Sequence, residues 1–582
     1  MMDFKTFLEN FDAIAEAPGG IPKLRSLILD LAVRGKLVSQ NPEDEPAESV
    51  LTKQHELPTS YERRKKRVKP SDLKLSESLF LEIPASWAYL TIQELYDANI
   101  LIDFADGNHG ELYPRKTDFG DSGITFVTAA QVINGRVVWE KCSKLIKEKA
   151  DQLNKGWAKA GDVLLTHNAT VGRVALVESD VDDFLLGTSV TFYRLNHSVI
   201  SPNYLFYVFC SILWQKQLEA VMEQTTRNQV SIQKQAFFKI PLPPLAEQKR
   251  IVEKVDELMG LCDRYEATKQ TRDNLRQKLR ESAIASLMNA ETDEELDAAW
   301  AFVRDNWQNL SQCPEDVSGL REATLQLAIR GKLVSQNIND ESVFDLLAKI
   351  TAEKKDLIKA KKIRDASTLP FEDSAFPCEI PNTWAWERFG NVILDIEAGA
   401  SPQCESRQKD GEEWGVIKIS AVSWNQFNPD ENKALPANME PRKEFEIKTG
   451  DFIMSRANTS QLVGKSVVVE NLPPRLLLND KTLRVLFPTC IEKRFFNLYN
   501  NSALARQYYA GGGTGTSDSM KNITREQIRN LPVPVPPLHE QKRIVAKVDE
   551  LMKLCDQLEA SLHLSQQRAE SLAASAISHL TI

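Results

Sequence analysis

The side chains best suited to chemistry in this chain are hydrogen-bonding groups in polar loops. One such loop in each half of the chain follows a short Lys-x-Gly-Asp segment, at 159–162 and at 448–451. Guanidinium, ammonium, amide and hydroxyl groups of this kind read base edges in DNA grooves. In the first half the candidates are Thr166, His167, Asn168, Thr170 and Arg173, and in the second half they are Arg456, Asn458, Thr459, Ser460 and Lys465.

A further polar loop precedes a proline-rich segment in each half. Its candidates are Thr226, Arg227 and Asn228 in the first half, and Thr516, Ser517, Lys521 and Asn522 in the second. The loops occupy corresponding positions but carry different side chains, as two different nucleic-acid sites would require. The alternative is that they are ordinary solvated turns, because most polar surface loops have no ligand.

Patterns for catalysis are missing. An adenine methyltransferase needs an Asn/Asp-Pro-Pro-aromatic loop, and no Pro-Pro pair here has those neighbours. The glycine-rich run 511–517 lacks the lysine of a phosphate-binding loop. The carboxylates of Asp430 and Glu431 mimic a nuclease motif but are adjacent in sequence, so we interpret them as a chance match. The scattered cysteines and histidines give no metal-ligand spacing. We therefore expect no catalytic residue and no metal site.

Two segments of the sequence each occur twice in the chain. Residues 24–41 and 320–337 match at 13 of 18 positions, and both contain Arg-Gly-Lys-Leu-Val-Ser-Gln-Asn. Residues 243–267 and 536–560 match at 20 of 25 positions, and both contain Glu-Gln-Lys-Arg-Ile-Val. The blocks between these anchors, 89–240 and 386–533, barely resemble each other. The repeat predicts two similar frames that carry two different globular domains.

The elements that position the loops follow from periodicity. Apolar residues at i, i+3, i+4 and i+7 predict a helix over 21–34, closed by Gly35, and its copy ends at Gly331. β-Branched runs predict strands at 123–127, 162–165, 189–195, 451–454, 466–469 and 482–487. Prolines at 241–244 and 532–537 are expected to stop each sheet. A heptad-like seam from Ile544 through Leu572 to Ala576, and another from Ile251 to Leu279, predict two long helices.

Charge and composition limit the function classes. The net charge is −9, whereas simple nucleic-acid binders are usually basic. Local basic runs at 61–69 and 354–364 could lie along phosphates, or they could be solvated helix faces. The longest apolar stretch, 204–214, is too short to span a bilayer, and the N-terminus lacks a signal pattern. We expect a cytoplasmic protein without a membrane partner.

The repeated anchors resemble the specificity subunit of Type I restriction–modification enzymes. The resemblance rests on the Pro-Pro-Leu-x-Glu-Gln-Lys-Arg-Ile-Val helix starts and the Gly-Lys-Leu-Val segments, each present twice, and it covers nearly the whole chain. It implies an α+β fold with two globular β-rich target-recognition domains, separated by long antiparallel conserved helices in a pseudo-twofold internal repeat. It also implies that the short N-terminal helix joins the C-terminal end.

The expected segments are 1–41 (N-terminal helical), 42–79 (charged connector), 80–242 (first recognition domain), 243–337 (central helical), 338–377 (charged connector), 378–535 (second recognition domain) and 536–582 (C-terminal helix). The resemblance implies a non-catalytic protein that binds double-stranded DNA, two modification (methyltransferase) subunits and two restriction (motor-nuclease) subunits. S-adenosylmethionine, ATP and Mg are expected on those partners. Partner-binding candidates are Gln248, Arg250, Val255, Leu258, Gln541, Arg543, Val548 and Leu551.

Two other function classes stay open at this point. A structural scaffold could dimerise a partner without reading DNA, and the acidic net charge favours it; two unlike domains disfavour it. A fused methyltransferase or nuclease is disfavoured by the missing catalytic patterns.

Overall fold

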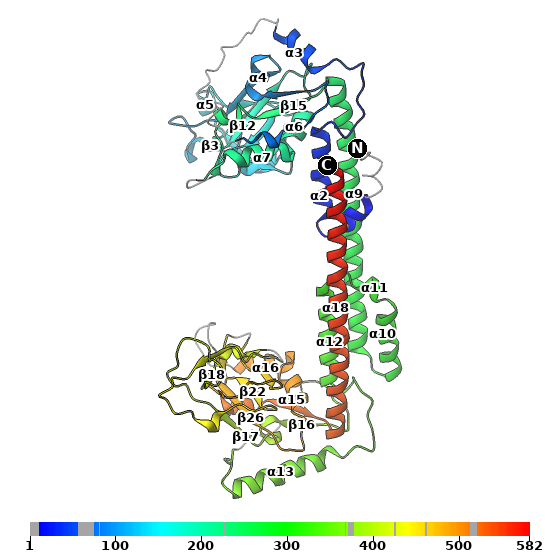
Figure 1. Cartoon of the computed structure of the whole chain (residues 1–582), viewed down its shortest axis with the longest axis vertical. Coiled ribbons are helices and arrows are strands. Elements are labelled where there is room, and N and C mark those ends of the chain that lie inside the picture. The colour runs from blue at the N-terminus through cyan, green and yellow to red at the C-terminus, as the bar shows by residue number, and fades with distance from the viewer. Residues whose placement is uncertain are drawn as a thin grey trace. The chain divides into compact units, whose positions relative to one another are not determined.

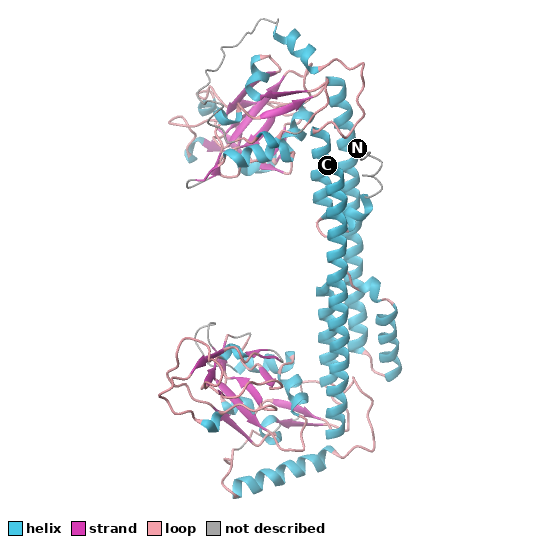
Figure 2. Cartoon of the chain, in the orientation of Figure 1, coloured by secondary structure: helices cyan, strands magenta, loops and turns pink. Residues whose placement is uncertain are grey.

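The computed structural model describes residues 11–55, 75–80, 82–224, 228–366, 368–369, 377–423, 426–459, 462–512 and 521–581. The chain forms two compact units, one of residues 1–273 with 565–582 and one of residues 274–564. The boundary between them falls within both long helices, α9 (Leu245–Asn289) and α18 (Leu538–Thr581). Within each unit, the strands are confined to one globular domain and the remainder is helical (Figure 2).

The first domain combines two sheets with flanking short helices (Figure 1). The four-stranded sheet has the order β10-β9-β12-β2 and the five-stranded sheet the order β3-β7-β4-β11-β8. The strands are β2 (Leu101–Asp106), β3 (Phe119–Gly120), β4 (Ile124–Val127), β7 (Ser143–Leu145), β8 (Trp157–Ala158), β9 (Val163–Thr166), β10 (Val174–Leu176), β11 (Phe184–Leu186) and β12 (Val190–Leu195). The helices of the domain are α4 (Ile92–Asp97), α5 (Lys147–Ala150), α6 (Pro202–Cys210), α7 (Ile212–Val221) and α8 (Ile232–Gln235).

The second domain repeats this topology although its sequence differs. Its four-stranded sheet has the order β17-β26-β22-β24, which matches β2-β12-β9-β10, and its three-stranded sheet has the order β21-β18-β25, which matches β7-β4-β11. In each case one strand pair is parallel, β11 with β4 and β18 with β25. The strands are β17 (Asp395–Ala398), β18 (Gly415–Ile417), β21 (Asn432–Ala434), β22 (Phe452–Ser455), β24 (Ser466–Val468), β25 (Leu476–Leu477) and β26 (Thr482–Leu486). Helices α14 (Phe389–Val392), α15 (Lys493–Asn500), α16 (Ala503–Gly512) and α17 (Arg525–Arg529) pack around them.

The predicted strands are confirmed within a residue or two. The role given to the prolines is confirmed for Pro243, Pro244, Pro536 and Pro537, which follow the last strand of each domain, but it is wrong for the prolines before them. Pro241 lies inside β15 (Lys239–Leu242), which pairs with β1 (Ala88–Thr91), and Pro532 and Pro534 lie inside β28 (Pro532–Val535), which pairs with β16 (Ala385–Arg388). These are two-stranded sheets, where a missing N–H on the outer edge interrupts no ladder. The proline segments therefore close each domain by joining its last strand to its first.

The repeated Gly-Lys-Leu-Val segments end two equivalent helices, α2 (Gly20–Val33) and α12 (Ser318–Ile329). Gly35 has φ +68°, and the Lys36 and Gly35 N–H groups donate to the carbonyls of Leu31 and Ala32, which is a Schellman cap. Gly331 repeats it at φ +70°. A Cβ at residue 35 would lie 2.5 Å from Cγ of Pro84. Only glycine therefore fits where each cap meets its domain.

The C-terminal end of the chain joins the N-terminal segment within the first unit. Ala573 is fully buried in the core that also holds α2, the start of α9 and the first recognition domain. In the second unit, Leu287 of α9 packs in one core with Cys555 of α18 and with α12. The two long helices are thus antiparallel, as expected.

The predicted heptad seam is wrong in places. Leu275 and Leu572 expose 62% and 58% of their surface, and Leu279 is also exposed. The predicted seam residues Ala569 and Ala576 of α18 are partly buried, and Ala573, next to Leu572, is the fully buried residue there.

The remaining helices belong to the connectors and to the central helical segment. They are α3 (Ala47–His55), α10 (Asp293–Asp305), α11 (Trp307–Leu310) and α13 (Val343–Lys359). Among the described residues, no helix is long and apolar enough to cross a membrane. The basic run 61–69 lies outside the described residues.

Candidate nucleic-acid interface

The two polar loops of the first domain meet at their backbones. Asn168 and Gln229 form an isolated antiparallel β-bridge. Two backbone hydrogen bonds flank it: the Ala169 N–H donates to the Asn228 carbonyl at 2.9 Å, and the Val230 N–H donates to the His167 carbonyl at 2.9 Å. The loop after β9 and the loop before α8 therefore form one cluster, although some 60 residues separate them.

The second domain builds the same cluster with the same backbone pattern. Strand β23 (Ala457–Asn458) pairs with β27 (Lys521–Asn522), and the Ile523 N–H donates to the Arg456 carbonyl at 3.0 Å. The register makes Arg456 the counterpart of His167, and Lys521 the counterpart of Asn228. The loop pairs predicted from the sequence are thus brought together in both domains.

The exposed members of each cluster differ between the domains. In the first domain Arg173 and Asn228 are exposed, and Asn168 and Thr170 are half-buried. In the second domain Arg456 and Thr459 are exposed, and Asn458, Lys521 and Asn522 are half-buried. Five candidates lie outside the described residues, namely Thr226, Arg227, Ser460, Thr516 and Ser517.

Three predicted DNA contacts are corrected because their side chains are buried. Thr166 is fully buried, and its hydroxyl accepts the Arg173 N–H at 2.9 Å. His167 is 4% exposed and hydrogen-bonds through Nδ1 with the Thr191 hydroxyl at 2.9 Å. Burial lowers the pKa of His167, which favours the neutral imidazole. Burial also lowers the pKa of Lys465, which is 7% exposed. These side chains support the loops from beneath.

Five predicted partner contacts are likewise corrected to interior residues. Gln248 donates to the carbonyls of Val199 and Pro243, and Gln541 donates to the carbonyl of Pro536. These amides and the side chains of Val255, Leu258 and Val548 are buried in their own units. A buried side chain cannot reach a partner while the fold is intact. Leu551 is half-buried, and its partner role stays a prediction.

The remaining two predicted partner-binding residues, Arg250 and Arg543, form equivalent ion pairs. Arg250 contacts Asp44 at 2.6 Å and Arg543 contacts Asp340 at 2.8 Å, and both carboxylates are largely buried. The sequence reasoning missed both aspartates. The signal was available, because each follows the repeated Ser-Gln-Asn by three residues. These pairs tie each connector to the start of its long helix.

A buried glutamate joins three repeated segments in each unit. Glu247 accepts hydrogen bonds from Trp87 Nε1 at 3.0 Å and Gln40 Nε2 at 2.6 Å. Glu540 does the same with Trp384 at 2.9 Å and Gln336 at 2.7 Å. We call each such group of four residues a joint: Gly35, Gln40, Trp87 and Glu247 in the first unit, and Gly331, Gln336, Trp384 and Glu540 in the second. Burial raises the pKa of Glu247 and of Glu540, and the hydrogen bonds partly offset that rise.

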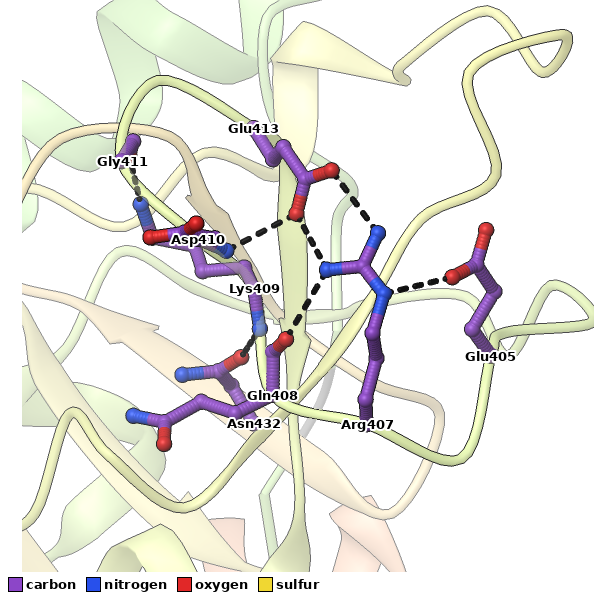
Figure 3. Close-up of polar contacts among 8 residues, drawn as sticks. All are labelled: Glu405, Arg407, Gln408, Lys409, Asp410, Gly411, Glu413 and Asn432. Carbon is purple, nitrogen blue, oxygen red and sulfur yellow. Dashed lines mark hydrogen bonds and ion pairs between the residues drawn. The ribbon is translucent and has the colours of Figure 1, made fainter.

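A cationic side chain beyond the loop clusters is neutralised internally (Figure 3). Arg407 forms ion pairs with Glu405 and Glu413, and Glu413 also accepts the Asp410 N–H at 2.8 Å. The guanidinium of Arg407 lowers the pKa of Glu413 to about 2. Its charge is therefore already balanced, and it orders the 405–413 loop instead of offering a free cation.

The nuclease-like carboxylates sit in a turn and bind side chains of their own domain. Glu431 accepts from Ser420 and Lys418, and Asp430 accepts from Gln408 at 3.1 Å. Within the described ranges, no group of three or more metal-ligand side chains comes together. The arrangement is that of a modular recognition protein, with two equivalent frames that present two unlike loop clusters.

Comparison with known proteins agrees with this class. The family described as Type I restriction modification DNA specificity domain matches residues 100–272 and 393–565. The chain is 31% identical to the Type I restriction enzyme EcoEI specificity subunit of Escherichia coli, over 95% of this chain and 93% of that protein. It is 27% identical to the EcoAI specificity subunit of Escherichia coli, over 95% and 92%. The crystal structure of the HsdS subunit from Thermoanaerobacter tengcongensis aligns with TM-score 0.43 and 18% identity, covering 85% of this chain and 98% of that one.

The chain belongs to the Type I restriction–modification DNA specificity family, with two copies of the family domain.

Proposed function

We propose that this chain supplies DNA sequence recognition to a Type I restriction–modification complex. Each loop cluster reads one half of a split, asymmetric target in double-stranded DNA, and the chain carries no catalysis of its own. The observation that carries this proposal is the pair of clusters, which share one backbone arrangement but present different side chains. The scaffold alternative is not favoured, because a scaffold has no need for unlike clusters and the family is one of DNA specificity.

Within each cluster, the exposed groups have separate tasks. Arg456 and Arg173 are suited to guanine edges or to phosphates, because a guanidinium presents paired donors. Asn168, Asn228, Asn458 and Asn522 are suited to adenine edges. The two half-sites are bound together, so that two modest affinities combine through effective concentration.

The partners of the complex follow from the same proposal. Two modification subunits bring S-adenosylmethionine, and two restriction subunits bring the ATP- and Mg-dependent motor and nuclease. Their docking surface includes Leu554 and Leu564 of α18, since exposed apolar side chains on a helix are suited to a partner protein. The complex acts in the cytoplasm, where the DNA lies.

The test is methylation mapping in a methylation-free host. The chain is expressed with its modification subunit, and modified adenines are located across the genome. A split motif that is modified only when this chain is present is the expected result. Modification that continues unchanged without the chain would exclude the recognition role.

A further inference from the structure

A short turn that belongs to neither polar loop borders the recognition cluster of the second domain. Residues 478–481 connect β25 to β26, and the Lys481 carbonyl accepts the Arg456 N–H at 2.8 Å. Because β22 pairs with β26 through Ser455 and Thr482, Arg456 and Lys481 stand opposite each other one step beyond that pair. Opposite residues of an antiparallel pair have their Cβ atoms about 4.5–5.5 Å apart. The two cationic side chains therefore leave the backbone next to each other.

The turn is held in place by groups other than the Lys481 side chain. The Lys481 N–H donates to Asn479 Oδ1 at 2.8 Å, and Asn479 Nδ2 donates to the Ile417 carbonyl at 2.7 Å. Asn479 itself is 7% exposed. On the other side, the Asp480 N–H donates to the Ser401 hydroxyl at 3.4 Å, and that hydroxyl donates to the Asp480 carboxylate. A buried amide below and the loop after β17 beside it thus fix where Lys481 stands.

The charges at this corner of the domain do not balance. The Lys481 side chain is 46% exposed and forms an ion pair with Asp480 at 3.3 Å. Arg456 is exposed and, in the part of the chain that the structure describes, forms no ion pair. Like charges directly opposite each other on a strand pair destabilise it. An electron-rich group bound across both side chains would remove that repulsion.

The first domain builds the same turn without the cations. The Ser189 carbonyl accepts the His167 N–H at 3.0 Å, one step beyond the pair of Thr166 with Val190. Ser189 therefore corresponds to Lys481, as His167 corresponds to Arg456. The Ser189 hydroxyl accepts the Ala129 N–H at 3.1 Å, and His167 is buried. The fold requires no cation at these positions, and the two turns share their backbone place but not their side chains.

Resting on the proposed DNA-reading function, we propose that the turn 478–481 is a third recognition segment of the second domain and that Lys481 is a specificity-determining residue. Its ammonium group donates to the O6 and N7 acceptors of one guanine, as lysine and arginine commonly do in the major groove. Successive base pairs are about 3.4 Å apart, so Lys481 and Arg456 can reach neighbouring positions of one half-site.

The test is to replace Lys481 in the full chain, expressed with its modification subunit. Lys481→Ser introduces the residue that the first domain has at this position, and the hydrogen bonds that hold the turn are kept. Lys481→Arg retains the cation. Lys448→Ser is the matched control, because Lys448 is also exposed but precedes β22, whereas Arg456 follows that strand.

Two measurements are made on each variant. Methylated adenines are mapped across the genome of a methylation-free host. The purified complex is then titrated with the mapped target duplex and with duplexes that are changed at one position of the second half-site at a time.

The expected result is that Lys481→Ser loses the preference for a G·C pair at one position of the second half-site, by about 5- to 150-fold, while the first half-site stays as in the parent. Lys481→Arg keeps that preference, and Lys448→Ser behaves as the parent does. An equal loss of affinity for all duplexes, with an unchanged motif, would assign Lys481 to a phosphate and overturn its reading role. Unchanged motif and affinity in folded Lys481→Ser would overturn the contact itself. A parent chain that directs no split motif would instead overturn the proposed function.

Discussion

The joint and the recognition cluster of each half differ in what the two halves of the chain share. At the joint, the same glycine, tryptophan, glutamate and glutamine recur in both halves with hydrogen bonds that agree within 0.1 Å. In the clusters the backbone pairing recurs, but the side chains differ, as in His167 and Arg456. Side chains that bind one another must be kept as a set, whereas loops held by backbone bonds leave their side chains free to vary.

The largest expected effect comes from breaking a joint. Gly35→Ala places a Cβ 2.5 Å from Pro84 Cγ and 3.1 Å from Trp87, in a left-handed conformation. Backbone strain and overpacking together are expected to lower the free energy of unfolding by about 2–4 kcal/mol. Chemical denaturation measures this change.

The control for that variant is Gly19→Ala. Gly19 has φ +64°, but no atom lies within 4 Å of its Cβ position. It is expected to show only the backbone cost of about 1–2 kcal/mol. Equal losses in the two variants would show that the contact with the Pro-x-x-Trp segment contributes nothing.

A smaller effect is expected from a cluster residue, and it should fall on DNA binding instead of folding. Arg456→Ala removes an exposed guanidinium without an ion pair among the described residues, so affinity for the target should fall by about 5- to 150-fold, equivalent to about 1–3 kcal/mol. The double variant Arg407→Ala/Glu413→Ala removes a cation together with its carboxylate and should bind as the parent does. Fluorescence anisotropy with a labelled duplex checks both, and equal losses would refute the distinction.

The smallest expected effect is on the pH dependence of stability. Because burial raises the folded-state pKa of Glu247, the folded protein holds that proton more tightly than the unfolded chain. The stability that this glutamate contributes is complete below its unfolded pKa of about 4.3 and is lost as pH rises through the folded value. The advantage of the parent over Glu247→Gln should therefore shrink as pH rises from acid to neutral.

Glu413 serves as a control, because its pKa is shifted in the opposite direction to that of Glu247. Its pKa is lowered to about 2 by Arg407, so the stability that it contributes is present above the unfolded pKa and is lost as pH falls through about 2. The advantage of the parent over Glu413→Gln should shrink toward acid pH. Denaturation curves over a pH series test both variants, and slopes of the same sign would contradict the assigned causes.

The sequence predicted the frame of this molecule better than its surface. Repetition marked the segments that later proved to form the joints and placed the polar loops at corresponding positions, and β-branched runs located the strands, because both signals are visible in the residue pattern itself. Burial is set by distant packing, so Thr166, Lys465 and Gln248 could not be identified as interior from their polar character. The seam at Leu572 was wrong for the same reason: alanine faces the core there, and leucine is left outside.

The most direct test of modular recognition exchanges residues 89–240 for the corresponding block of another family member, while both joints are kept. Methylated adenines are then mapped in a methylation-free host with the same modification subunit. The account predicts that one half of the split motif changes and that the other half stays as in the parent. A change in both halves, or in neither, would contradict it.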